Sequence, residues 1–241
     1  MRHGLRIAAI SALFVAFVGI AAPAQAADRD SLVNQIGTFE YLTQPDFTGL
    51  APLSDALAGA TLGIGTFDGL DGELIVVGGV PYRVGMDGRP TVVDTSRSTP
   101  FAQAVNFRPD AAGPVAPGTA CADLGPVIQR LAGTDDGIIA VRVRGTFTDL
   151  VARSVPSQTA PYPSLATVIA QQAVFPLAGR RAVLVGFLQA SDMKGIGQPG
   201  LHLHGLTADR SAGGHVLSCV VGSDVQVSVQ RTSGVIVHDE R

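Results

Sequence analysis

Apolar residues recur along this chain in short runs that suit β-strands better than long helices. Residues 73–77 and 80–84 are rich in apolar side chains and flank Gly78-Gly79, a two-residue turn signal, so we expect a β-hairpin there. Residues 138–148 form another extended segment, and residues 181–190 form a nearly continuous apolar strand. The pattern predicts a strand-rich fold.

The alternation also assigns side chains to the two faces of a strand. Within 138–148, Arg142 and Arg144 share one face, opposite the valines that alternate with them. Two more apolar strands, 215–221 and 225–230, are separated by Gly-Ser-Asp at 222–224. This spacing predicts a second hairpin.

Helical patterns are fewer. The best covers residues 164–175, where Ser164 is a suitable N-cap, apolar residues follow the i, i+3, i+4 spacing, and Pro176 ends the run. Residues 52–58 and 123–131 are weaker helix candidates.

These elements predict an α+β fold with two β-rich lobes, a mixed sheet and an open, barrel-like sheet, and few helices. A Pro-, Gly- and Ala-rich stretch at 109–119 looks like a loop or the boundary between the lobes. We expect residues 27–241 to form this domain. The 241 residues, of which 46% are apolar, are enough for its core.

Residues 1–26 have the pattern of a secretory signal peptide. Arg2 and Arg6 precede an apolar run that ends in Ala24-Gln25-Ala26, an A-x-A cleavage site. We expect cleavage near Ala26 and a mature protein that is secreted or periplasmic and has no membrane segment. The alternative is an uncleaved N-terminal anchor.

Charge and composition exclude several classes of function. The formal net charge is −3, and no basic patch is large enough for a nucleic-acid surface. Lys194 is the only lysine, which disfavours Schiff-base and pyridoxal-phosphate chemistry. Cys121 and Cys219 form a disulfide or remain two separate buried thiols, and the sequence leaves both alternatives open.

Three histidines form the main candidate site. His202 and His204 alternate with leucines, so a strand places both imidazoles on one face, and a polar, Gly-ending loop leads to His215 on the next strand. An antiparallel return brings the three rings together as a three-ligand metal site with an open position. Zn²⁺ suits such ligands, although another divalent transition metal fits the ligand type, and an H-x-H pair in a strand also occurs facing solvent.

Other motifs are weaker. The glycines around Gly63 and Gly65 have the wrong spacing for a dinucleotide-binding loop, and no G-x-S-x-G motif occurs. Glu73 follows two Asp-Gly turns, and a buried carboxylate beside a metal is a suitable proton carrier. The alternative is that these turns only lead into a strand.

At these residues the sequence resembles the alpha-acetolactate decarboxylase family. The resemblance covers nearly all of the chain beyond residue 26, and its most specific parts are the G-T-F-D-G-L-D-G-E segment and the H-x-H-x10-H spacing. The matching segments are 35–39, 62–74, 99–101, 141–147, 152–156, 161–162, 200–204 and 209–217.

The resemblance implies an active site. It places Zn²⁺ on His202, His204 and His215, and it places Glu73 and Arg153 in the active site with Thr66 nearby. It also implies a two-lobed fold and a homodimer.

The implied reaction is the decarboxylation of 2-acetolactate, a small 2-hydroxy-3-oxo acid, to (R)-acetoin and CO₂. Zn²⁺ acts as the Lewis acid that stabilises the enediolate, Arg153 orients the carboxylate, and Glu73 delivers the proton. Family members commonly have a longer C-terminal tail with a glutamate that reaches the metal. This chain stops at Arg241, so Glu240 takes that place or the contact is absent.

Three alternatives compete with this interpretation. The L-H-L-H-G run is similar to a strand of the Cu/Zn superoxide dismutases, which need more histidine ligands than this chain offers. A cupin-like module expects a glutamate shortly after H-x-H, and residues 205–210 contain none. A metal-sequestering protein without decarboxylase activity is the third.

Overall fold

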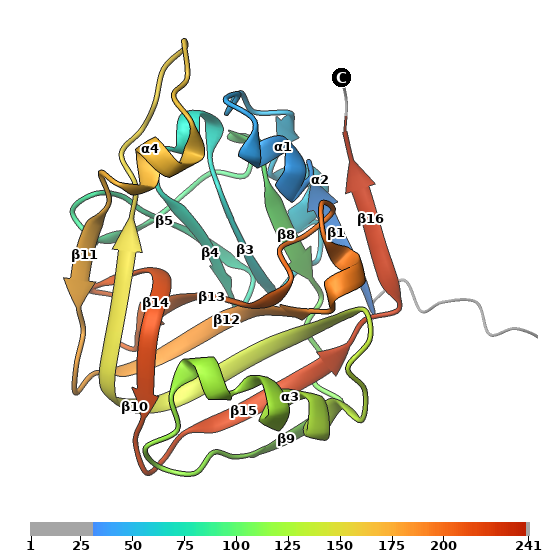
Figure 1. Ribbon diagram of the computed structural model, residues 1–241, viewed down its shortest axis with the longest axis vertical. Coiled ribbons are helices and arrows are strands. Elements are labelled where there is room, and N and C mark those ends of the chain that lie inside the picture. Colours follow the sequence, from blue (N-terminus) through green and yellow to red (C-terminus); the bar gives the residue numbers. More distant parts are fainter. Residues whose placement is uncertain (1–30, 240–241) are drawn as a thin grey trace, which may run out of the picture.

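The computed structural model describes residues 31–239, and these build two large sheets that pack against each other (Figure 1). The predicted signal peptide at 1–26 and Glu240 lie outside the described residues. Within the described residues no helix is both long and apolar enough to cross a membrane. The predicted strand-rich α+β class is confirmed.

The first sheet is mixed. The β1–β16 pair is parallel and every other pair is antiparallel. The predicted hairpin at Gly78-Gly79 is confirmed as β4 and β5. In spatial order the strands are β16 (Gly234–His238), β1 (Leu32–Ile36), β8 (Ala102–Val105), β3 (Leu62–Thr66), β4 (Glu73–Val77), β5 (Val80–Val84) and β6 (Pro90–Val92).

The second sheet closes into a small barrel, and its longest strand is β10 (Ile138–Ser154). The first part of β10 pairs with β12 and its last part pairs with β14, so β10, β12, β13 and β14 form a closed ring. Its other strands are β12 (Arg181–Gln189), β13 (Gly200–Thr207), β14 (Gly213–Val221), β15 (Gln226–Arg231), β9 (Ala111–Pro114) and β11 (Ala173–Pro176).

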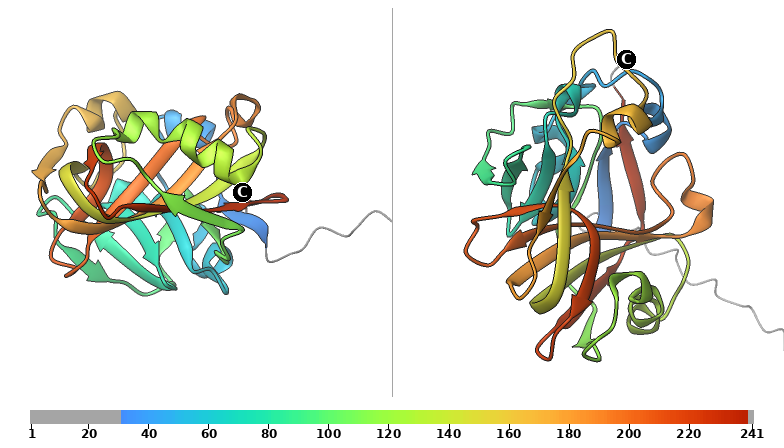
Figure 2. Two further views of the ribbon diagram at one scale, coloured as in Figure 1. Left: turned by 90° about the horizontal axis from the view of Figure 1, so that it is seen from below. Right: turned by 60° about the vertical axis from the view of Figure 1, so that its left-hand side comes forward.

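Short helical segments and one small ladder complete the fold. Helix α3 (Gly125–Ala132) lies across the second sheet, as Figure 2 shows from below, and Ile128 is buried in the barrel core. The remaining elements are α1 (Phe39–Thr43), α2 (Ser54–Leu57), α4 (Leu165–Ile169), η2 (Asp68–Leu70), η3 (Cys121–Asp123), η4 (Ser191–Met193), and the paired strands β2 (Ala51–Pro52) and β7 (Ser98–Thr99).

A shared apolar core joins the two sheets. Val183, Val185 and Phe187 of β12 are buried against Ile64 of β3 and Ile75 of β4. Packing these side chains together removes apolar surface of both sheets from water. This burial is the main reason that the sheets hold a fixed relative position.

The helix predicted for 164–175 is shorter than expected. Ser164 caps α4 as predicted, and its hydroxyl accepts a hydrogen bond from the Thr167 amide, but the helix ends at Ile169. Residues 173–176 instead form β11, which pairs with Val151–Ser154 of β10. Pairing with a preformed strand edge outweighs the weak helical preference of this segment. The 109–119 stretch, expected to be a loop, likewise contains β9, which pairs with β15.

The hairpin predicted at 222–224 is wrong. Strands β14 and β15 do not pair with each other, and both run along the same long strand, β10. The segment between them does not reverse the chain direction, because both strands run antiparallel to β10. Its Gly222 amide donates to the Thr146 carbonyl oxygen, and the Asp224 carboxylate accepts from the Thr146 amide. A turn-like sequence therefore marks an irregularity in one continuous edge, because β10 is long enough to pair with both strands.

The two cysteines are joined. A disulfide links Cys121 in η3 to the buried Cys219 in β14, across 98 residues of sequence. This decides between the two alternatives that the sequence left open. The bond ties η3 to the strand that also bears His215.

Replacing Cys121 by serine is expected to lower the free energy of unfolding by about 2–4 kcal/mol, because a crosslink that closes a long loop restricts the unfolded chain. The measurement is urea unfolding followed by circular dichroism. Dithiothreitol should destabilise the parent protein by a similar amount and leave the variant unchanged. Equal unfolding midpoints for parent and variant under oxidising conditions would contradict the expectation.

Candidate metal centre and active site

A pocket of about 340 Å³ is lined by residues of β3, β4, β13 and β14 and of the helices α1 and α4. Figure 1 shows the two helices above the place where β13 and β14 pass β3 and β4. Most of its wall is apolar. The lining residues are Phe39, Leu42, Gly65, Thr66, Leu70, Glu73, Phe101, Arg153, Val155, Leu165, Ile169, Gln172, Gln198, His202, His204, His215 and Leu217.

The three histidines meet in this pocket. His202 and His204 share a face of β13, and His204 is the direct cross-strand partner of His215 on β14. The Nδ1 atom of His215 lies 3.1 Å from Nε2 of His202 and 3.3 Å from Nε2 of His204. The side-chain alternation and the antiparallel return predicted from the sequence therefore bring all three rings together.

Two glycines allow the strands to approach closely at the rings. A Cβ atom at Gly186 of β12 would lie 1.9 Å from the His202 carbonyl oxygen, and one at Gly214 would lie 2.4 Å from the Arg153 carbonyl oxygen. Any larger residue at these positions would push the strands apart. The local sequence thus fixes the spacing of the strands on which the rings are mounted.

The surroundings keep the imidazoles neutral and orient one of them. Burial lowers the pKa of His202 to about 4, helped by the positive charge of Arg153. Burial likewise lowers the pKa of His204 and His215, and the neighbouring imidazoles and Arg153 further disfavour a positive charge on these rings. His204 Nδ1–H donates to the Leu74 carbonyl oxygen at 2.8 Å, so the lone pair of its Nε2 atom faces the other rings.

This arrangement fits a transition-metal ion. Two nitrogens that each lie about 2.0–2.1 Å from a tetrahedral ion are roughly 3.3 Å apart, and the ring nitrogens here are separated by 3.1 and 3.3 Å. His202, His204 and His215 are the one group of metal-ligating side chains of this kind within the described residues. Three neutral ligands leave a further coordination position for substrate.

Glu73 and Arg153 form a buried ion pair beside the histidines. Arg153 Nη1 donates to Glu73 Oε1 at 2.8 Å, and Glu73 Oε2 lies 3.6 Å from Nε2 of His204. Burial raises the pKa of Glu73 to about 7, although Arg153 opposes the shift. The carboxyl group can therefore hold or release a proton near neutral pH.

The positions of these two residues follow from strand register. Arg153 is the cross-strand partner of His215, and Glu73 is the first residue of β4, opposite Thr66 of β3. The Thr66 hydroxyl lies in the pocket wall and donates to the Gly72 carbonyl oxygen at 2.8 Å. The structure thus gathers all six residues that the sequence singled out, while Glu240 lies outside the described residues.

Sequence reasoning missed several groups in the pocket wall. Gln172 lies within the helix predicted for 164–175, yet in the structure it follows α4 and lines the pocket, and its Oε1 atom is buried with no hydrogen-bond partner among residues 31–239. Gln198 and the apolar side chains of α1 also line the pocket. No local pattern marks them, because only the packing of α1 and of the segment that bears Gln198 brings them to the pocket.

Comparisons with known proteins show the family of this chain. The sequence profile described as Alpha-acetolactate decarboxylase matches residues 33–239. The chain belongs to the alpha-acetolactate decarboxylase family. This membership places it among enzymes, in a family named for a carboxy-lyase activity.

Named relatives and solved structures extend the match over most of the chain. An alpha-acetolactate decarboxylase from Methanosarcina mazei is 35% identical over 79% of this chain, which covers 66% of that protein, just under two thirds. One from Klebsiella aerogenes is 33% identical over 81% of this chain and 75% of that protein. The crystal structure of the alpha-acetolactate decarboxylase from Bacillus subtilis strain 168 superposes with a TM-score of 0.81, at 30% identity, over 86% of this chain and 88% of that one. This family assignment replaces the cupin-like and superoxide-dismutase-like alternatives.

Proposed function

We propose that this protein is a zinc-dependent decarboxylase that converts 2-acetolactate into (R)-acetoin and CO₂. The observation that carries the proposal is the convergence of three neutral imidazoles on one point, next to a buried carboxyl–guanidinium pair, in a pocket of about 340 Å³. The names of the relatives support the choice of substrate.

Loss of CO₂ from 2-acetolactate leaves the electron pair of the broken C–C bond on the substrate as an enediolate. A Zn²⁺ ion held by His202, His204 and His215 supplies, when bound, the Lewis acid that stabilises this negative charge. The neutral state of the three rings matters here, since it leaves the full charge of the ion available to the substrate.

Arg153 orients the substrate carboxylate before it leaves. Its guanidinium is largely buried at the pocket wall and held on one side by Glu73, so its remaining N–H groups have a fixed direction. A planar guanidinium suits paired hydrogen bonds to a carboxylate.

Glu73 is the proton donor in this proposal. It holds a proton on a carboxyl oxygen near neutral pH and delivers it to one face of the enediolate carbon, which gives a single enantiomer. The Oε2 atom faces the histidines and the Oε1 atom faces Arg153, so the carboxyl group has one orientation relative to both.

The direct test is to incubate the purified protein with 2-acetolactate and measure acetoin with and without a chelator. We expect acetoin formation that stops after chelation and returns when Zn²⁺ is added back. A metal-sequestering protein would bind the added Zn²⁺ but form no acetoin. Full activity after complete removal of the metal would contradict the role of the ion.

Replacing Arg153 by lysine is expected to lower kcat/KM by about 10- to 100-fold, because a point charge loses the paired hydrogen bonds and leaves Glu73 with a poorer partner. Steady-state kinetics with 2-acetolactate measure the effect. The exposed Arg130, replaced in the same way, serves as the control. An unchanged kcat/KM for Arg153→Lys would show that Arg153 has only a structural role.

Two further properties belong to the proposal. We propose export of the protein after cleavage near Ala26, and the disulfide supports this because such bonds persist in oxidising compartments. N-terminal sequencing of the mature protein tests it.

We also propose a homodimer, which light scattering during gel filtration tests.

A further inference from the structure

Four arginines from three parts of the chain line a second groove, of about 270 Å³. We call it the arginine groove, and its arginines are Arg142, Arg144, Arg181 and Arg210. The rest of its wall is small or apolar and comes from Val77, Gly78, Ala182, Val183 and Ala208. The groove shares no lining residue with the active-site pocket.

The strand pattern places these side chains at the open end of the interface between the sheets. Ile138 and Ala140 of β10 are buried against the first sheet, and Arg142 and Arg144 continue the same face of the strand. On β12, Arg181 continues the face of Val183 in the same way. The interface is therefore apolar at its centre and cationic where it meets solvent.

Two of the guanidinium groups are held by aromatic rings. The Arg142 guanidinium lies 5.2 Å from the centre of the Phe107 ring, and that of Arg210 lies 5.6 Å from the centre of the Tyr82 ring. Contact with a ring leaves the N–H edges of a guanidinium available as hydrogen-bond donors, and of these Arg210 Nη1 already donates to the Thr207 carbonyl oxygen at 3.3 Å. These edges are preorganised for an acceptor in the groove.

Protein carboxylates balance only one of the four positive charges of the groove. No aspartate or glutamate lines it, and within residues 31–239 Arg181 alone of the four pairs with a carboxylate, that of Asp224. Burial, and to a lesser extent the positive charge of the nearby Arg144, lowers the pKa of Arg142.

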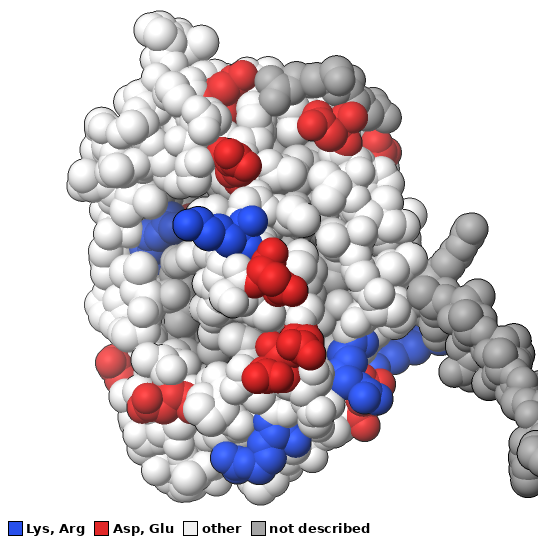
Figure 3. Space-filling view, turned by 45° about the vertical axis from the view of Figure 1, so that its right-hand side comes forward, with Lys and Arg blue, Asp and Glu red and all other residues white. Residues whose placement is uncertain are grey.

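Several arginines outside the groove have carboxylate partners. Five of them outside the groove form ion pairs with carboxylates: Arg83, Arg97, Arg153, Arg180 and Arg231. On the face drawn in Figure 3, acidic side chains are scattered between small groups of basic ones. A groove with four arginines and no acidic wall is unusual for this acidic protein, whose net charge is −3.

We propose that the arginine groove is a second binding site, and that it takes a small multivalent oxyanion with phosphate or carboxylate groups. Arginine edges match both groups, since each offers paired acceptor oxygens. The volume of about 270 Å³ suits a small molecule. Such an occupant would relieve the repulsion among the four cations.

The test is isothermal titration calorimetry of the zinc-loaded full chain with inorganic phosphate and, separately, with succinate, at fixed ionic strength. We expect saturable binding of at least one of the two, weakened at least about 10-fold by Arg142→Gln and by Arg144→Gln. The stronger of the two ligands identifies the preferred group. Circular dichroism and the Tm of each variant verify that it is folded.

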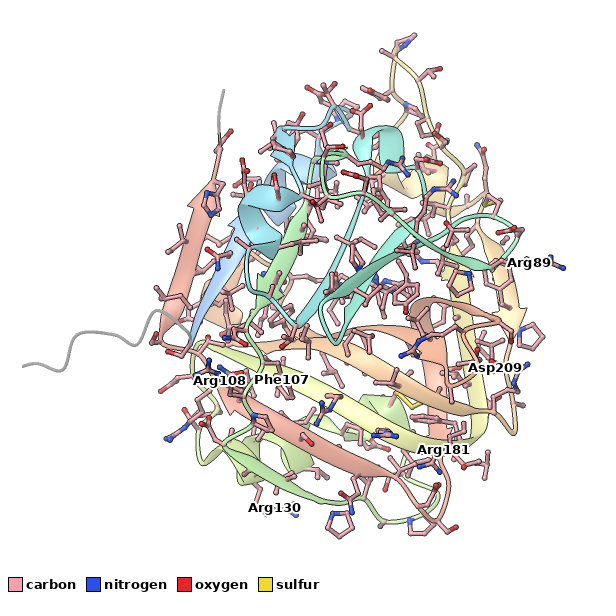
Figure 4. The ribbon with its side chains drawn as sticks, turned by 180° about the vertical axis from the view of Figure 1, so that it is seen from behind. Arg89, Phe107, Arg108, Arg130, Arg181 and Asp209 are labelled. Carbon is pink, nitrogen blue, oxygen red and sulfur yellow. A yellow bond between two sulfur atoms is a disulfide. The ribbon has the colours of Figure 1, made fainter. Side chains whose placement is uncertain are left out.

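Matched controls are Arg130→Gln and Arg89→Gln. Both side chains are exposed, and in Figure 4 they project outward at the edges of the molecule, apart from Arg181 and Phe107. They remove the same charge, so they should leave binding unchanged. Absence of saturable binding of both anions, or an equal loss of binding in the control variants, would overturn the proposal.

Discussion

Replacing His204 by alanine is expected to remove both the metal and the decarboxylase activity. His204 is the most enclosed of the three rings, its side chain being 1% exposed, and its Nε2 atom lies within reach of both His215 and Glu73. We expect turnover to fall by at least about 10³-fold, since the loss of one donor that stabilises a developing oxyanion already costs roughly 10²–10³-fold.

Metal analysis after dialysis and an acetoin assay measure this effect together. His238→Ala is the matched control, because His238 lies on β16 and not in the pocket wall. Loss of His204 also removes the hydrogen bond to the Leu74 carbonyl, so the more accessible His215 provides a second variant, His215→Ala, that tests the metal site without this change. A His204 variant that keeps stoichiometric zinc and normal turnover would refute the three-histidine site.

Replacing Glu73 by glutamine is expected to lower turnover by about 10²–10⁴-fold while fold and metal content stay unchanged. Glutamine has nearly the same shape and can still accept the hydrogen bond from Arg153, but it has no proton to deliver at neutral pH. The three histidines remain in place, so zinc should still bind.

The measurements are kcat for acetoin formation, zinc content, and the Tm of the variant. Glu40→Gln, at an exposed position in α1, removes a carboxylate outside the pocket wall and serves as the control. If Glu73→Gln retained nearly normal turnover, Glu73 would have no part in the proton transfer.

Much of the site could be predicted from the sequence because it depends on short-range order. Alternation along residues 200–204 places His202 and His204 on one face whatever the rest of the fold does, and the short loop after Thr207 returns the chain to His215. The hairpin formed by β4 and β5 was predictable for the same reason. Periodicity and turn residues act over a few positions, so one sequence is enough to detect them.

Tertiary structure decided the features that depend on distant partners. The same kind of turn signal that makes a hairpin at Gly78-Gly79 makes only an irregularity at 222–224, because β10 was available to both neighbouring strands. The helix predicted for 164–175 ends early because residues 173–176 pair with β10 as strand β11. Local preferences amount to a fraction of a kcal/mol per residue, and a competing ladder of hydrogen bonds overrides them.

The sequence by itself determined which side chains share a strand face, and hence that three imidazoles could converge. Only the tertiary structure decided that Arg153 contacts Glu73, 80 residues away, that Cys121 bonds to Cys219, and that four arginines share one groove. These contacts depend on how two sheets pack and in which register their strands pair. Both are set by the burial of the whole apolar core, which no short segment of sequence contains.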